Sequence, residues 1–272
     1  RRHDNDGERT SEISVPPTAG EILCERPPYV PRNAPSMWED NMEHLKPLQA
    51  GTASAIMDVH FRLLRQDFVE PLREAVLGYR REQKDKDGHS GGRGSVFKAK
   101  TGGGRSLLSL LVFSNVRVLG VTGTSRSGVS VWLEFDKPEA VRKLSRAKWN
   151  DYWEKAGRLA VATMVVLCED TDTGTGSSIE GEREGDVDLL LDFAVISERD
   201  VEELSKGGQR GKIGVTFDSS TETVSGIERM LDRGGLSGDG RLLMLQPSNS
   251  YFAYRPILRV LKSSAREVIP FA

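Results

Sequence analysis

The segment Met57–Val76, MDVHFRLLRQDFVEPLREAV, carries the clearest periodicity of this 272-residue chain. Its apolar residues recur at helical spacing and predict one buried helical face, formed by Phe61, Leu64, Phe68 and Leu72. Pro71 lacks an amide hydrogen and interrupts the regular hydrogen bonding of a helix. We therefore expect a kinked helix, or two helices that meet near residues 67–71.

Three arginines of the same segment project away from the apolar face. At about 100° per residue, Arg62, Arg65 and Arg73 lie within about 80° of one another. Asp58 precedes Arg62 by one helical turn, a spacing that favours an ion pair. The arginines fit three roles: exposed surface residues, contacts to nucleic acid, or ion pairs with a partner element.

Residues 1–35 are expected to form an extended arm. They contain six prolines, which fix the backbone and remove amide donors, so neither a helix nor a central strand is expected there. Residues 36–83 form a helical segment, whose first helix begins with the capping-box pattern of Ser36 and Glu39.

Beyond residue 92 the helical period gives way to eight short apolar runs separated by turn residues. The runs begin at residues 95, 107, 116, 129, 159, 188, 211 and 241. Helical patterns occur at residues 139–155 and 251–265, and Pro256 either kinks the second helix or begins its regular part. The fold class is therefore α+β, mainly an antiparallel β-barrel over residues 93–246.

Charge is unevenly distributed, although the net charge is only −2. Residues 93–150 hold 11 Lys or Arg against 3 Asp or Glu, a difference of +8. Residues 169–204 hold 2 against 13, a difference of −11. The basic segment could face phosphates while the acidic segment lies elsewhere, or both could be ordinary solvated surface.

The basic segment interleaves cations with aromatic residues, a combination that suits single-stranded nucleic acid. The candidate nucleic-acid contacts are Lys98, Lys100, Arg105, Arg117, Arg126, Lys143, Arg146 and Lys148. The aromatic residues among them are Phe97, Phe113, Trp132, Trp149, Tyr152 and Trp153. For Trp132, which alternates with its strand neighbours, core packing is the preferred interpretation.

Motifs of catalysis and of metal binding are absent from the sequence. No run matches the phosphate loop G-x-x-x-x-G-K-[ST], and no catalytic Ser or Cys pattern is present, so no enzymatic site is expected in this chain. Its four histidines show no metal-ligand spacing, and neither a metal nor a cofactor is expected. The two cysteines, Cys24 and Cys168, favour a reducing intracellular compartment. No apolar run reaches the about 20 residues of a membrane span.

Several motifs, in the same order along the chain, resemble the region that precedes the motor of NFX-type zinc-finger-containing RNA helicases. This family is a branch of the Upf-like superfamily 1 helicases. Phe61–Glu74 (FRLLRQDFVEPLRE) is the most specific match to the family. The others are WEKAGRLAVATMVVL at residues 153–167, FAVISERDVEEL at 193–204, NSYFAYRPILRVLK at 249–262 and IPF at 269–271.

The resemblance implies an accessory, non-catalytic β-barrel carried on stalk helices in an ATP-dependent RNA helicase. Residues 36–83 would then hold one stalk helix, residues 93–246 the barrel, residues 250–264 the returning stalk helix and residues 265–272 the lead-in to a motor outside this chain. The stalk residues would be Phe61, Leu64, Phe68, Pro71 and Leu72. Ion pairs to the partner helix of the stalk or to the motor become the preferred role of the arginines.

The implied partners are single-stranded RNA, the motor of the same polypeptide and proteins of RNA silencing or surveillance, without a membrane. The expected location is intracellular, in the cytoplasm or in or around the nucleus. A second hypothesis is a protein-interaction module. In it the proline-rich arm at residues 1–35 and the acidic segment at residues 169–204 would bind a silencing or antiviral partner.

Overall fold

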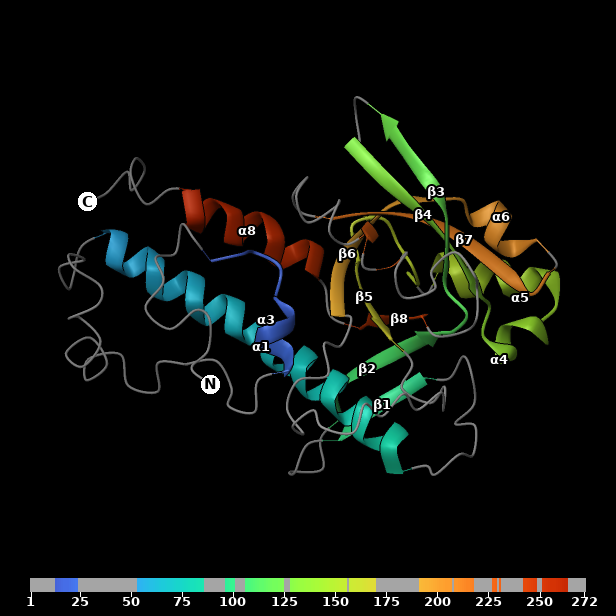
Figure 1. Ribbon diagram of the computed structural model, residues 1–272, viewed down its shortest axis with the longest axis horizontal. Helices are drawn as coiled ribbons and strands as arrows, with labels where there is room; N and C mark the ends of the chain where they lie inside the picture. Colours follow the sequence, from blue (N-terminus) through green and yellow to red (C-terminus); the bar gives the residue numbers. More distant parts are fainter. Residues whose placement is uncertain are drawn as a thin grey trace. The chain divides into compact units, whose positions relative to one another are not determined.

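The computed structural model describes only part of the chain. The described residues are 13–23, 53–85, 96–100, 106–124, 128–155, 157–169, 191–206, 208–217, 227–228, 230, 242–248 and 251–263. The chain divides into two compact units, Arg1–Leu77 with Asn249–Ala272, and Gly78–Ser248 (Figure 1). The expected capping box at Ser36 and Glu39 lies outside the described residues. The domain boundaries expected from the sequence remain predictions.

Three helices are described in the first unit: α1 (Ala19–Leu23), α8 (Tyr251–Ser263) and α3 (Ala53–Asp85), which continues into the second unit. α3 is a single helix with Pro71 in its interior, so the expectation of two helices is wrong. Pro256 likewise lies inside α8 rather than at its start. A proline costs one backbone hydrogen bond, and the buried side chains of these helices compensate for that loss.

The apolar face of α3 is buried, as its period predicts. Phe61, Phe68 and Leu72 are buried, whereas Leu64 is half-buried. The ring of Phe68 lies between Tyr251 and Tyr254 of α8, with ring centroids at 5.1 Å and 5.6 Å. Phe68 lies three residues before Pro71 on α3. Its packing against α8 explains why the helix continues through the proline.

The arm contains a short helix, contrary to the expectation of no helix over residues 1–35. Thr18 and Glu21 form a capping box around the start of α1: the Thr18 amide donates to Glu21 Oε2 at 2.7 Å, and the Glu21 amide donates to Thr18 Oγ1 at 3.3 Å. The sequence T-A-G-E carries this signal. The arm prolines flank α1 instead of entering it.

Eight antiparallel strands form the second unit. They are β1 (Val96–Lys100), β2 (Ser106–Phe113), β3 (Arg117–Thr124), β4 (Gly128–Asp136), β5 (Met164–Glu169), β6 (Leu191–Arg199), β7 (Arg210–Thr216) and β8 (Leu242–Pro247). The order across the sheet is β1-β2-β8-β5-β6-β7-β4-β3. Every expected strand is confirmed, although β5 begins at Met164 rather than near residue 159.

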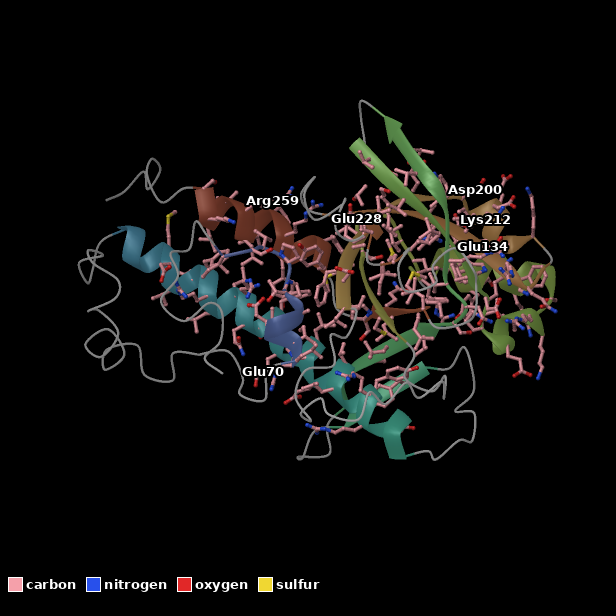
Figure 2. All side chains as sticks on the ribbon, in the orientation of Figure 1. Glu70, Glu134, Asp200, Lys212, Glu228 and Arg259 are labelled. Atoms are coloured by element: carbon pink, nitrogen blue, oxygen red, sulfur yellow. The ribbon has the colours of Figure 1, made fainter. Side chains whose placement is uncertain are left out.

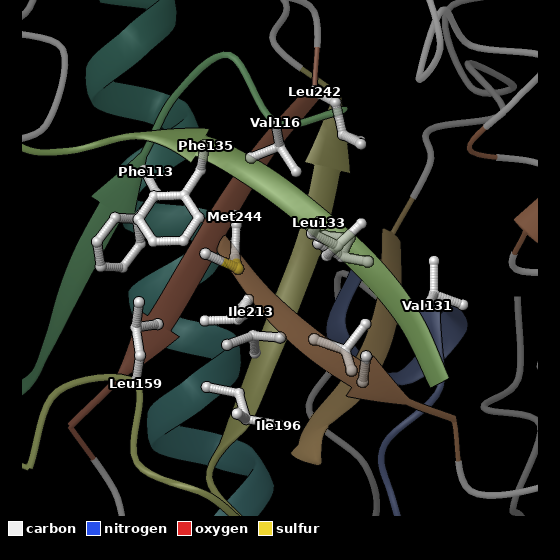
Figure 3. Close-up of a cluster of buried hydrophobic side chains, with 14 of the residues drawn as sticks. Phe113, Val116, Val131, Leu133, Phe135, Leu159, Ile196, Ile213, Leu242 and Met244 are labelled. Atoms are coloured by element: carbon white, nitrogen blue, oxygen red, sulfur yellow. The ribbon is translucent and has the colours of Figure 1, made fainter. Parts of the chain in front are cut away.

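The sheet is open, so the prediction of a closed β-barrel is wrong for the described strands. The sheet ends at β1 and β3, and these two strands do not pair with each other among the described residues. Its strands nevertheless enclose one core, because residues of β2 through β8 contribute to the same buried cluster (Figure 3). The register shifts in β1, β3 and β6, as it does at β-bulges, which bend and twist a strand locally.

Residues 139–155, expected to be helical, form α4 (Glu139–Arg142), α5 (Arg146–Asn150) and the π-helical turn η1 (Asp151–Lys155). A fourth short helix, α6 (Val201–Ser205), begins at Asp200, whose side chain accepts a hydrogen bond from the Glu203 amide at 3.1 Å. The buried residues Trp153 and Leu204 anchor these helices in the core of the sheet.

Candidate functional site

The outer face of β3, β4 and β7 gathers cations around a tryptophan. On β4, Val131, Leu133 and Phe135 point into the core cluster, so Trp132, Glu134 and Asp136 point to the opposite side. The strand register sets their neighbours: Glu134 is opposite Arg117 on β3 and Lys212 on β7, and Asp136 is opposite Arg210. We call this set the outer-face patch: Arg117, Trp132, Glu134, Asp136, Arg210 and Lys212.

Glu134 holds two arginines of the outer-face patch in place. It is buried, and its Oε2 accepts hydrogen bonds from Arg117 Nε at 2.6 Å and from Arg210 Nη1 at 2.8 Å. Asp136 continues the network, because its carboxylate lies 3.8 Å from Arg210 Nε and 3.5 Å from Arg142 Nη2. The arginine side chains stay 36% and 39% exposed, so their remaining N–H groups can reach a ligand.

Lys212 is the cation of the patch that the network leaves free. It is exposed and lies directly opposite Glu134 on the neighbouring strand (Figure 2). Within the described part of the chain it has no ion pair or hydrogen bond. A lysine without an internal partner loses no ion pair when it binds a phosphate, so Lys212 is the best-placed phosphate contact of the patch.

The charge state of Glu134 is set by opposing effects. Burial raises its pKa, but the hydrogen bonds and charges of Arg210 and Arg117 outweigh burial and hold the pKa below its ordinary value of 4.5. A carboxyl group whose pKa is lowered by folding stabilises the folded state above its unfolded pKa. This contribution is lost as the pH falls through the folded pKa.

We expect Glu134→Gln to lower the free energy of unfolding at neutral pH by roughly 1 kcal/mol, because water screens the partly exposed arginines. The difference between wild type and variant should shrink as the pH falls below 4.5, the ordinary pKa of the group. Thermal unfolding at several pH values measures it. Glu139→Gln, which removes an exposed pair with Lys143, is the control and should change little. A pH-independent difference for Glu134→Gln would contradict the assignment.

Trp132 contributes an aromatic surface to the patch. It is half-buried and does not belong to the core cluster, so the expectation that it packs in the core is wrong. Its indole Nε1 donates to Thr122 Oγ1 on β3 at 3.1 Å, which satisfies the N–H group and fixes the ring. Of the other aromatic residues considered as nucleic-acid contacts, Phe113 and Trp153 are buried in the core.

The remaining aromatic residues are engaged inside the second unit. Phe97 packs edge-to-face on Tyr79, with ring centroids 5.6 Å apart. Trp149 packs against the core and donates its Nε1 to the Val141 carbonyl at 2.6 Å. Tyr152 lies under Arg158, whose guanidinium is 3.6 Å from the ring centroid. Trp132 therefore stands out as the aromatic residue of the patch.

Of the six expected cationic contacts that lie among the described residues, the structure brings one, Arg117, into the outer-face patch. Lys98 and Lys100 lie on the edge strand β1. Lys143 follows α4 and pairs with Glu139, whereas Arg146 and Lys148 lie on α5. Arg105 and Arg126 lie outside the described residues.

Sequence reasoning missed Arg210, Lys212 and Glu134. Arg210 and Lys212 are two residues apart on β7, which places both side chains on one face of the strand. That spacing was a usable signal, but the two cations lie outside the basic segment at residues 93–150. Only the pairing of β4 with β7 brings them beside Arg117 and Trp132.

The described residues point to neither metal chemistry nor a membrane crossing. Among them, no group of His, Cys, Asp and Glu side chains is arranged to hold a metal ion. No described helix, including the 33-residue α3, is long and apolar enough to span a membrane. The outer-face patch itself combines cations, an aromatic ring and hydrogen-bond donors.

Comparison with known proteins finds distant relatives over nearly the whole chain. No family model matches it. It is 24% identical to the human NFX1-type zinc finger-containing protein 1 over 260 residues, which are 95% of this chain and 10% of the relative. The mouse protein of the same name is 24% identical over 269 residues, which are 98% of this chain and 11% of the relative. The chain thus spans about a tenth of these relatives and shares a distant similarity with NFX1-type zinc finger-containing proteins.

Proposed function

We propose that this chain is an accessory, non-catalytic region of an ATP-dependent RNA helicase of RNA silencing or surveillance, and that it binds single-stranded RNA. The observation that carries the binding role is the outer-face patch, where the unpaired Lys212 lies beside Trp132 and two partly exposed arginines. The distant similarity to NFX1-type zinc finger-containing proteins and the resemblance of Phe61–Glu74 to the helicase family support the helicase role.

Positive charge and an aromatic face together favour single-stranded nucleic acid over other ligands. Lysine and arginine attract the phosphates, and a ring with a free face accepts an unpaired base. The catalytic step would belong to the motor outside this chain, so the isolated chain should not hydrolyse ATP. ATP hydrolysis by the longer polypeptide that rises with added RNA would support the helicase role, and hydrolysis by the isolated chain would contradict its non-catalytic part.

We expect Lys212→Glu to raise the Kd for a labelled single-stranded RNA about tenfold at low salt, because one phosphate contact becomes a repulsive charge. The slope of log Kd against the logarithm of the salt concentration should also decrease by about one, the value for one lost phosphate contact. Fluorescence anisotropy of the RNA at several salt concentrations measures both effects.

Two charge-reversed controls accompany this variant. Lys155→Glu alters an exposed lysine on η1 that pairs with Asp151, and it should leave the Kd within about twofold of wild type. Lys148→Glu tests the exposed lysine of α5 that was predicted as a contact. If Lys148→Glu weakens binding and Lys212→Glu does not, the interface lies on α5 and the outer-face patch is not the RNA site.

A protein-interaction module is the second candidate function, and the β3–β4 hairpin favours it. The hairpin exposes Leu119, Val121 and Val129, which are 44%, 50% and 47% exposed. β3 is also an edge strand of the sheet, where a partner strand could add. Loss of a co-purifying partner in Val121→Thr, with unchanged affinity for RNA, would favour this candidate.

A further inference from the structure

Trp132 has a glycine directly opposite it on each of the two adjacent strands, and we call these three residues the Trp132 row. Trp132 is paired with Gly120 on β3 and with Gly214 on β7, and all three face the outer side of the sheet. Cross-strand neighbours normally cover such a ring, because their side chains stand about 5 Å away. With glycine at both positions, neither directly paired residue covers the indole with a side chain.

The two sides of this row differ. A Cβ placed on Gly214 would lie 3.0 Å from Glu198 Cβ, so the side chain of Glu198 bounds the row toward β6. A Cβ placed on Gly120 would meet no atom within 4 Å, so the space beside Trp132 over β3 is open. The open side is therefore the side over Gly120.

We infer that one base of a single-stranded RNA stacks on Trp132 in the open space over Gly120, with a neighbouring phosphate bound by Lys212. This inference rests on the proposed function and names the contact that distinguishes single strands from duplexes. The Thr122 hydroxyl holds the indole N–H, so the ring offers its π face and no hydrogen-bond donor to the base. Stacking of this kind tolerates every base, because each base has a π face.

Lys212 lies on the side of the row suited to a phosphate. Lys212 is next to Gly214 on the same face of β7, two residues along the strand and diagonally across from Trp132. Diagonal neighbours in a sheet lie about 7–8 Å apart, a distance that a lysine side chain and one nucleotide can bridge. In the opposite direction along the strands, the outer face carries the neutral residues Thr122 and Ser130.

The first test changes the ring of Trp132. Trp132→Leu keeps apolar bulk but removes the π face, and it should raise the Kd for single-stranded RNA about tenfold. Trp132→Phe retains a π face and should stay within about threefold of wild type. Duplex RNA of the same length, whose bases are already stacked, should show no such difference between the two variants.

The second test fills the open space and leaves Trp132 in place. Gly120→Val puts a branched side chain where the base would stack, and it should raise the Kd about tenfold. Gly123→Val is the matched control. Both glycines lie on β3, neither has a positive φ, and neither position has a heavy atom within 4 Å of an added Cβ. Gly123 is paired with Val129, so its side chain would point to the inner side of the sheet and should not affect binding.

The outcomes separate the inference from the proposed function. If the wild-type chain binds no single-stranded RNA at low salt, the proposed function itself fails. If the wild type binds, and Trp132→Leu and Gly120→Val bind equally well, RNA binding stands but stacking on Trp132 is wrong. Equal loss in Gly120→Val and Gly123→Val would trace the effect to the β3–β4 hairpin and would also overturn the stacking site. Thermal unfolding of each variant excludes loss of fold as the cause.

Discussion

Replacing Arg65 with alanine is expected to lower the free energy of unfolding of the first unit by about 3–5 kcal/mol. Arg65 is only 6% exposed, and its guanidinium pairs with the fully buried carboxylate of Glu21. It also donates to the Ser14 carbonyl at 2.8 Å and to the Pro16 carbonyl at 3.1 Å. The variant leaves a buried charge and two carbonyls without this donor. The segment that contains α1 should therefore detach from α3.

Chemical denaturation followed by circular dichroism measures this loss, and hydrogen exchange at the Ile22 amide reports on α1 directly. Arg62→Ala is the matched control from the same helix. It breaks a partly exposed pair with Asp58 and should cost about 0.5 kcal/mol. The double variant Arg65→Met with Glu21→Leu should regain part of the loss, because it leaves no buried charge. A loss in Arg65→Ala no larger than that in Arg62→Ala would refute the role of the buried pair.

Phe135→Ala is expected to destabilise the second unit by about 3–5 kcal/mol, through lost burial and the cavity that remains. Phe135 is fully buried and packs edge-to-face on Phe113, with ring centroids 4.9 Å apart (Figure 3). Val129→Ala is the control, because Val129 lies on the same strand and the same face but is 47% exposed. It should change the free energy of unfolding by less than about 0.5 kcal/mol.

A double-mutant cycle with Gly211 sharpens this prediction. A Cβ on Gly211 would lie 2.7 Å from Phe135 Cζ and 2.9 Å from Leu204 Cδ2, so Gly211→Ala alone should cost about 1–3 kcal/mol. In the Phe135→Ala background one of these clashes is gone, and Gly211→Ala should cost less. Additive effects would show that Phe135 does not fill the space over Gly211.

Local periodicity predicted α3, α8 and the eight strands, but not α1 or α6. The spacing of Phe61, Phe68 and Leu72 predicted the buried face of α3, because a helical period reports which residues share a face. The eight strands were likewise recognisable from short apolar runs and the turn residues between them. Of the two alternatives expected at Pro71, two separate helices is wrong, because α3 continues through the proline and packing between α3 and α8 outweighs the cost of one missing hydrogen bond.

The candidate site was harder to predict, because alternation along a strand separates two faces without saying which of them water covers. Trp132 stands between Val131 and Leu133, and its apolar character suggested burial. In the structure the inner face of β4 packs into the core, and Trp132 lies on the outer face. The partner found for Arg65 shows the same limit: residue spacing placed this arginine away from the apolar face, and only the structure shows that it is buried against Glu21 of the arm.

The order of residues alone indicated α3, α8, the eight strands and the side chains that share a face, since these depend on neighbours within a few positions. Strand order, the open sheet and the outer-face patch depended on tertiary structure. Arg117, Trp132 and Lys212 come from three strands, and β4 pairs with β7 across more than 70 residues of intervening chain. Such pairing is decided by burial of the common core, in which seven strands take part, and no local pattern encodes it.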